Sequence, residues 1–172
     1  MCGFVVTTDV KNTELMLSKQ AFRGPDAQSF YKDSFVGMGH ALLDINGEKQ
    51  IQPYKTKNGN YIVFNGEMYD TTIANDTEYL ANGLETYGVD FLVHNDWHGS
   101  LVWYKPKEKE VFMVRDHFGA KPLWHYQKGS EFTITTSLRS ILNGEPDNTY
   151  EKEYRVNSLL QGDECHIKNV RK

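Results

Sequence analysis

A strand-like segment begins at the second residue of the chain. From Cys2 to Thr8 the residues are mostly apolar or β-branched, with Phe4, Val5 and Val6 in succession. Runs of this kind are typical of strands. We therefore expect the N-terminus to be held within the folded structure, and the rest of the chain to be built around a strand that starts almost at its first residue.

The remaining pattern predicts further strands and a few helices. The pair Asn58-Gly59 lies between Tyr54 and the apolar run Tyr61–Phe64, which indicates a hairpin. Helical spacing predicts a helix over 76–87, with Asn75 or Asp76 as its cap and Gly88 after its end. Further helical patterns cover 13–22 and 137–143, and further strand patterns cover 29–31, 35–45, 101–104, 111–114, 123–126 and 132–136. The second half is expected to be mostly antiparallel sheet.

Length and charge exclude several classes of protein. The 172 residues fit one domain, and the net charge of −4 comes without a basic stripe, which argues against nucleic acid as the main partner. We find no apolar stretch long enough to cross a bilayer and no signal segment, so we expect a cytoplasmic protein without a membrane partner. Cys2 and Cys165 lie at opposite ends of the chain, and we expect both to be reduced thiols.

The cysteine after the initiator methionine has a chemical property of its own. Removal of Met1 leaves one residue, Cys2, that carries both a thiol and a free α-amine. An α-amine ordinarily titrates near pH 8, so it can accept the thiol proton directly or through a water. The alternative is that Cys2 is only a small apolar residue at the start of a buried strand.

Several short motifs point to a known family. In order, they are Met1-Cys2-Gly3-Phe4, Arg23-Gly24-Pro25-Asp26, Gln52-Pro53, Asn65-Gly66-Glu67-Met68-Tyr69, Asp76-Thr77-Glu78 and Arg115-Asp116-His117-Phe118-Gly119-Ala120-Lys121-Pro122-Leu123. Through these motifs the chain resembles class II glutamine amidotransferases of the N-terminal-nucleophile type, and in particular the glutaminase domain of asparagine synthetase. The resemblance spans roughly residues 2 to 142.

The resemblance implies a fold and an activity. The fold is an α+β structure, a four-layer αββα sandwich with two antiparallel sheets between helical layers. We expect one such domain over residues 2–172 with no synthetase domain. The implied activity is hydrolysis of glutamine, or of a related small amide, with the ammonia passed to a separate synthetase or transferase. No cofactor and no metal are implied.

The same resemblance assigns catalytic roles. Cys2 would supply the attacking thiolate and the amine that protonates the departing ammonia, after which water resolves the thioester. The Asn65 side-chain amide and the Gly66 backbone N–H would stabilise the oxyanion. An Asn-Gly pair after a strand is otherwise usually a turn, so this alternative stays open.

Positioning and substrate-binding roles follow in the same way. Arg23 and Gly24 would orient the N-terminal residue, while Asp76 and the region of Glu67 would hold the α-amine of the substrate. Structural alternatives exist, because Arg23 could simply brace the turn at Pro25 and Asp76 could only cap a helix.

One position departs from the family pattern. Class II domains usually carry an arginine two residues after a histidine, where it binds the substrate carboxylate, but this segment reads His40-Ala41-Leu42. Losing a charge-assisted contact should weaken glutamine binding by about 1.5–3 kcal/mol. Either another cation replaces the arginine, or the substrate is an amide without that carboxylate, or the domain is a catalytically impaired or non-catalytic binding or regulatory protein. The short spacing between Glu67 and Asp76 also predicts a shallower or more open pocket.

Two other groups of polar residues receive structural interpretations. His94, Asp96 and His98 alternate as metal-ligand types, but their glycine and polar neighbours favour a solvated loop, and we predict no metal site. Arg115-Asp116 and Lys121-Pro122 are interpreted as packing and turn residues.

Overall fold

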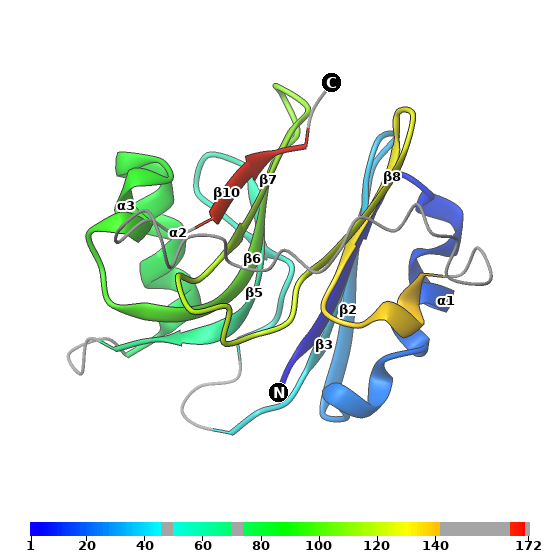
Figure 1. Cartoon of the computed structure of the whole chain (residues 1–172), viewed down its shortest axis with the longest axis horizontal. Helices are drawn as coiled ribbons and strands as arrows, with labels where there is room; N and C mark the ends of the chain where they lie inside the picture. The colour runs from blue at the N-terminus through cyan, green and yellow to red at the C-terminus, as the bar shows by residue number, and fades with distance from the viewer. Residues whose placement is uncertain (46–49, 70–73, 142–165, 171–172) are drawn as a thin grey trace.

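Two antiparallel sheets lie face to face between outer helices (Figure 1). The computed structural model describes residues 1–45, 50–69, 74–141 and 166–170. Figure 1 shows α2 (Asp76–Tyr87) and α3 (Asp90–Val93) on the outer face of one sheet and α1 (Thr13–Ser18) on the outer face of the other. The predicted α+β class and αββα layering are therefore confirmed.

The first sheet is built around the N-terminal strand. Its order is β2-β3-β1-β9-β8. All five residues of β1 are buried, and the strand pairs with β3 through Gly3 opposite Ala41 and with β9 through Val5 opposite Thr135. Cys2 therefore sits at the end of the central strand. The strands are β1 (Gly3–Thr7), β2 (Ala27–Lys32), β3 (Gly37–Leu42), β8 (Trp124–Lys128) and β9 (Glu131–Thr135).

The second sheet has the order β10-β7-β6-β5-β4. The predicted hairpin joins β4 to β5, with Gly59 at φ 85° and the Thr56 N–H bonded to the Asn60 carbonyl at 2.8 Å. A positive φ is where glycine carries no steric cost. The strands are β4 (Tyr54–Lys55), β5 (Tyr61–Met68), β6 (Trp97–Lys105), β7 (Glu110–Arg115) and β10 (His166–Asn169).

The helix α2 (Asp76–Tyr87) has the bounds that the sequence predicts. The Asn75 side chain accepts a hydrogen bond from the Glu78 N–H, and Gly88 follows the last turn at φ 65°. The predicted helix over 13–22 is instead divided into α1 (Thr13–Ser18) and a 3-10 turn, η2 (Ala21–Arg23). The other helical elements are η1 (Val10–Asn12), α3 (Asp90–Val93) and η3 (Leu138–Ser140).

Alternation along the strands separates three apolar layers. Phe4 and Val6 face the opposite sheet, where they join Met38, Val63 and Met113 in the core between the sheets. Val5 faces the other way, where it and Ala41 of β3 form a cluster with Met16 and Leu17 of α1. A third cluster, which includes Ile62, Phe64, Leu80, Leu84 and Leu101, joins the second sheet to α2 and α3. The period of two along β1 thus connects both of its faces to apolar layers.

The solvated-loop interpretation of residues 94–98 is wrong in part. Trp97 is buried, and β6 begins there, with His98 directly opposite Glu67 of β5. Within the described ranges, no group of three histidine, cysteine or carboxylate side chains could hold a metal ion. Nor does that part of the chain contain a helix long and apolar enough to span a membrane. Cys165 and most of the segment after Ile141 lie outside the described residues.

Candidate active site

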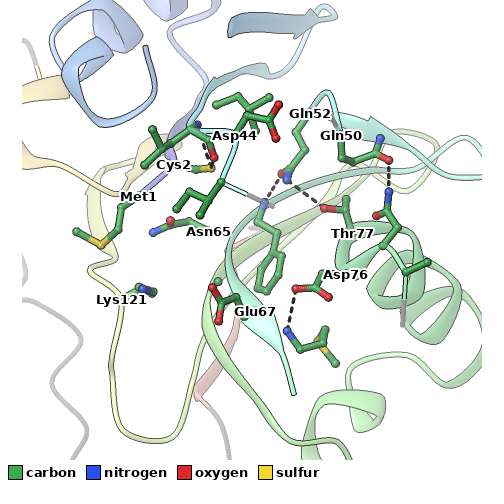
Figure 2. Close-up of a pocket in the computed structure, with 18 residues that line it drawn as sticks. Met1, Cys2, Asp44, Gln50, Gln52, Asn65, Glu67, Asp76, Thr77 and Lys121 are labelled. Carbon is green, nitrogen blue, oxygen red and sulfur yellow. Dashed lines mark hydrogen bonds between the residues drawn. The ribbon is translucent and has the colours of Figure 1, made fainter. Parts of the chain in front are cut away.

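A pocket of about 390 Å³ opens where the two sheets meet beside the N-terminus (Figure 2). Five of the predicted site residues line it, namely Cys2, Asn65, Gly66, Glu67 and Asp76. Its walls come from the two residues before β1, the end of β3 and the segment after it, the end of β5, the start of α2, and Lys121. Among these five residues, the most distant pair in sequence is Cys2 and Asp76, which are 74 positions apart.

The backbone and side chain of Cys2 are both fixed. Its Sγ atom accepts a hydrogen bond from the Leu43 N–H at 3.5 Å and lies 3.7 Å from the Leu43 carbonyl oxygen, to which the thiol can donate. Its own carbonyl accepts from Arg23 Nε at 3.1 Å. Met1 precedes it with half of its surface exposed. The thiol is therefore held at the edge of the pocket while the residue before it reaches solvent.

Arg23 and Gly24 support the N-terminal segment from η2. Burial lowers the pKa of Arg23, while the charge of Cys2 acts in the opposite direction. A Cβ atom on Gly24 would lie 2.1 Å from the Ala41 carbonyl oxygen, so only glycine allows η2 to approach β3 this closely. Arg23 contacts the backbone of Cys2 rather than its thiol.

Asn65 presents an unused hydrogen-bond donor to the pocket. The residue is 3% exposed and lies within β5, so the turn interpretation of Asn65-Gly66 is wrong. Its Nδ2 atom has no hydrogen-bond partner among the described residues. Buried polar atoms are rarely left unpaired in folded proteins. An unpaired amide lining a pocket with a thiol is therefore a donor available to a ligand.

Gly66 permits the close approach of two strands at this point. It lies opposite Gly99 of β6, and a Cβ atom on Gly66 would be 2.1 Å from the His98 carbonyl oxygen. A Cβ atom on Gly99 would be 2.9 Å from the Asn65 carbonyl oxygen. The two glycines together determine how β5 passes the pocket, and hence where Asn65 lies.

Two carboxylates enter the pocket from different elements. Asp76, the first residue of α2, accepts a hydrogen bond at Oδ2 from the Met68 N–H at 3.1 Å. The helix cap is Asn75, so the interpretation of Asp76 as only a cap is wrong. Glu67 is exposed and projects from β5. Figure 2 shows the two side chains on the same side of the thiol.

Gln52 is a residue of the site to which the sequence analysis gave no role. It is 5% exposed, its Oε1 accepts from the Phe64 N–H at 2.6 Å, and its Nε2 donates to Thr77 Oγ1 at 3.2 Å. It therefore links β5 to α2 immediately beside Asn65. The motif Gln52-Pro53 was the sequence signal for this residue. Its two hydrogen-bond partners, however, are set by the tertiary structure.

Lys121 is the second such residue, and its interpretation as only a turn residue is incomplete. The turn itself is as expected, because Arg115 donates from Nε to the Lys121 carbonyl at 2.7 Å and from Nη2 to the Gly119 carbonyl at 2.6 Å. Asp116 accepts from the Ala120 N–H at 3.0 Å. These contacts present Lys121 to the pocket lining, close to Met1 in Figure 2.

The charges around the pocket are mostly negative. Among the described lining residues, Asp44, Glu67 and Asp76 carry carboxylates, and Lys121 is the one cationic side chain. Leu42, at the position where the family pattern has an arginine, is 8% exposed and also lines the pocket. No charged side chain therefore stands at that point of the wall.

Behind the pocket, the buried His40 is neutral at physiological pH. It lies on β3 with no exposed surface. Burial lowers its pKa to about 4, against an interaction with the Phe64 backbone that raises it. His40 is thus a core residue on the strand that leads to Leu42.

Known proteins share this sequence pattern over the whole chain. A family model described as a glutamine amidotransferase domain matches residues 1–172. The chain belongs to the glutamine amidotransferase domain family.

Curated relatives of this amidotransferase domain include two asparagine synthetases (glutamine-hydrolysing) of Bacillus subtilis. Number 3 is 28% identical over 174 residues, covering 86% of this chain and 28% of its own length. Number 2 is 30% identical over 143 residues, covering 72% and 18%. The amidase chry2 of Gibberella zeae is 26% identical over 77% of this chain and 22% of its own length. The amidotransferase domain thus spans less than a third of these relatives.

Solved structures share the fold at low sequence identity. Glutamine phosphoribosylpyrophosphate amidotransferase from B. subtilis superposes with a TM-score of 0.65 at 16% identity, over 82% of this chain and 43% of the other. A structure described as the allosteric regulatory enzyme of purine biosynthesis gives a TM-score of 0.65 at 15% identity, over 89% and 45%. These likenesses show the fold of the amidotransferase domain.

Proposed function

We propose that this amidotransferase domain hydrolyses the side-chain amide of glutamine, or of a related small amide, through Cys2 after removal of Met1. The observation that carries the proposal is the unpaired, buried Nδ2 of Asn65 in the same pocket as the Cys2 thiol. An amide hydrolase needs a nucleophile and a fixed donor for the oxyanion, and these two residues supply them.

The reaction uses both functional groups of the N-terminal residue. The Cys2 thiol gives its proton to the α-amine and its sulfur adds to the amide carbon. The oxyanion is stabilised by Asn65 Nδ2 and the Gly66 N–H. The C–N bond then breaks, and the ammonia leaves with the proton returned by the amine. Water hydrolyses the thioester to a carboxylic acid and regenerates the thiol.

Other residues orient the reactants. The hydrogen bond from Arg23 to the Cys2 carbonyl fixes the N-terminal residue, and Gly24 allows η2 to come close enough to make that contact. Asp76 and Glu67 would receive the substrate α-amine, since both are carboxylates at the pocket. Orientation of this kind contributes to the rate because the reacting atoms no longer have to find one another.

We further propose that the ammonia passes to a separate synthetase or transferase in the cytoplasm. The support is that relatives named as glutamine-hydrolysing asparagine synthetases align with this chain over less than a third of their length. A single domain over residues 2–172 would then supply the glutaminase half of a two-protein reaction.

A second candidate is a non-catalytic binding or regulatory protein on the same scaffold. Leu42 is the observation that favours it, because an apolar side chain cannot pair with a substrate carboxylate. This candidate predicts binding of a small amide without turnover.

Ammonia release separates the two candidates. Protein whose loss of Met1 has been verified by intact mass would be incubated with glutamine and other small amides, beside Cys2→Ala and Cys2→Ser. The enzyme proposal expects ammonia and the matching acid from the unsubstituted protein only. Equal ammonia release by Cys2→Ala, or no ammonia release from any amide, would contradict the enzyme proposal.

A further inference from the structure

We infer that the pocket prefers a side-chain amide substrate that carries an α-amine but no free α-carboxylate, such as an N-terminal glutaminyl group. This inference rests on the proposed amide hydrolysis and specifies its substrate class. The chemistry shared by such substrates is a γ-carboxamide, a cationic amine and an α-carboxyl group masked as an amide. A small glutamine α-amide and the N-terminus of a peptide both provide it.

The charge distribution of the pocket is the first argument. Asp44, Glu67 and Asp76 line it, and Lys121 is the sole cationic side chain in the described part of the lining, which the α-amine of the N-terminal residue also borders. Carboxylates favour an amine and oppose a second carboxylate, because like charges brought together in a binding site are unfavourable. Free glutamine would bring one of each, whereas a masked substrate brings only the amine.

The position of Lys121 is the second argument. Figure 2 shows Lys121 and Asp76 on opposite sides of Glu67, with Lys121 at the end near Met1. In free glutamine the amine and the carboxylate are bonded to one carbon atom, so they cannot occupy opposite ends of a pocket. A substrate whose amine is held by Asp76 therefore has its α-carboxyl group on the side away from Lys121.

The wall on which that group must lie is the third argument. Leu42 is 8% exposed and carries no charge, and the pocket lining continues to the exposed Ile45, which is 67% accessible. An uncharged amide can rest on these apolar side chains at a lower desolvation cost than a carboxylate. Asp44 and Ile45 at the rim of the pocket are both exposed.

The unpaired Asn65 amide indicates that a ligand belongs in this pocket at all. Its Nδ2 is buried, lines the pocket and has no partner among the described residues. This observation does not depend on the acidic side chains, and Asn65 lines the same pocket as Cys2. The γ-amide carbonyl of the substrate is the acceptor that the geometry assigns to it.

The reaction with such a substrate is balanced by water alone. The thiol of Cys2 adds to the γ-amide carbon, ammonia leaves, and water converts the thioester to a γ-carboxylic acid. The masked α-carboxyl group is untouched. L-Glutaminamide would thus give ammonia and isoglutamine, while hydrolysis of its other amide would give glutamine.

A comparison of substrates on the unsubstituted chain tests the inference. Protein lacking Met1 would be assayed with L-glutamine, L-glutaminamide, the amide of Gln-Ala and N-acetyl-L-glutaminamide. We expect kcat/KM for glutaminamide and Gln-Ala amide to exceed that for glutamine by about 10-fold or more, because no like charge is brought together. The acetylated compound should lose a similar factor, because it has no amine. Mass and NMR analysis must identify isoglutamine as the product of glutaminamide.

Introduction of a positive charge at the wall is the matched variant. Leu42→Arg should raise kcat/KM for glutamine by about 10-fold and lower that for glutaminamide, since a guanidinium pairs with a carboxylate. Leu15→Arg places the same charge on the exposed surface of α1, outside the pocket lining, and should leave the ratio unchanged. A higher rate with Gln-Ala amide than with glutaminamide would assign the source to peptides, and equal rates to small amides.

The outcomes separate this inference from the function on which it rests. If Cys2-dependent hydrolysis of glutamine were as efficient as that of glutaminamide, the inferred substrate class would be wrong, but the proposed amide hydrolysis would not be contradicted. Ammonia released from none of the compounds would overturn the hydrolase itself. Because the first comparison needs no substitution at Leu42, misfolding of Leu42→Arg would not decide either question.

Discussion

Replacing Asn65 by alanine tests the oxyanion role of the residue that carries the functional proposal. The Asn65 Nδ2 atom has no hydrogen-bond partner among the described residues, so its removal breaks no hydrogen bond within that part of the fold. The residue lies inside β5, whose backbone pairing with β6 does not depend on the side chain. Asn65→Ala should therefore affect the transition state more than the free energy of unfolding.

The expected magnitude follows from that separation. Loss of one oxyanion donor typically lowers kcat by about 10²- to 10³-fold, or about 2.7–4 kcal/mol of transition-state stabilisation. Losing an unpaired polar atom should cost little stability, because no buried partner is left unsatisfied. KM should change by much less than kcat, since the contact strengthens only as charge develops on the oxygen.

The assay compares steady-state ammonia release with urea unfolding for the same protein. Ser100→Ala is the matched control, because Ser100 lies opposite Asn65 in the sheet and donates to the Pro122 carbonyl at 3.2 Å. It should lose stability but retain kcat per folded molecule. An Asn65→Ala protein that kept its kcat, or that lost activity only in proportion to unfolding, would refute the oxyanion assignment.

Three further predictions concern the support of the site. Gln52→Leu leaves the buried Phe64 N–H without its acceptor, so thermal unfolding should show a loss of about 1–3 kcal/mol and a Tm lower by several degrees; an unchanged Tm would contradict the bridging role. His40 has its pKa lowered by burial from the ordinary 6.5 to about 4. The unfolded chain therefore takes up this proton first as the pH falls. About 3 kcal/mol of stability should be lost between pH ~6.5 and ~4. Urea titrations should show that His40→Gln loses less unfolding free energy than the unsubstituted protein over that pH range. An equal loss would contradict the role of the buried His40 in this pH dependence. Arg23→Met should lower kcat about 10-fold or more by releasing the Cys2 carbonyl, with partial recovery in Arg23→Lys, and a fall in Tm without a kinetic change would point to a packing role only.

Local signals in the sequence were sufficient for much of the fold. The hairpin at Asn58-Gly59 and the bounds of α2 depend on turn and cap residues whose preferences act over a few positions. The early strand was predicted from the run after Cys2. Its central place in the sheet, between β3 and β9, depends on pairing over long sequence distances and could not be derived from that run.

The start of β6 was not predicted as a strand because it contains glycine. The segment Trp97–Ser100 resembles a turn because glycine and polar residues are poor strand formers. In the structure, Gly99 faces Gly66 across two closely spaced strands, where a Cβ atom would collide with backbone. The need for glycine on one strand is set by the other, so neither segment reveals it alone.

The order of the motifs predicted most of the candidate site. The residues that it missed have roles that depend on tertiary structure. Cys2, Asn65 and Asp76 do line one pocket. Gln52 and Lys121 escaped assignment because their roles depend on which backbone atoms and which cavity the fold brings to them. Sequence spacing carries no information about either.

Trapping the acyl-enzyme is the most direct test of N-terminal thiol chemistry. The unsubstituted protein would be mixed with glutaminamide or glutamine, quenched in acid, and examined by intact mass and by fragmentation of its N-terminal peptide. The account predicts that active protein lacks Met1 and carries one acyl group of the substrate on Cys2, absent from Cys2→Ala. Active protein that retains Met1, or an acyl group on any other residue, would contradict it.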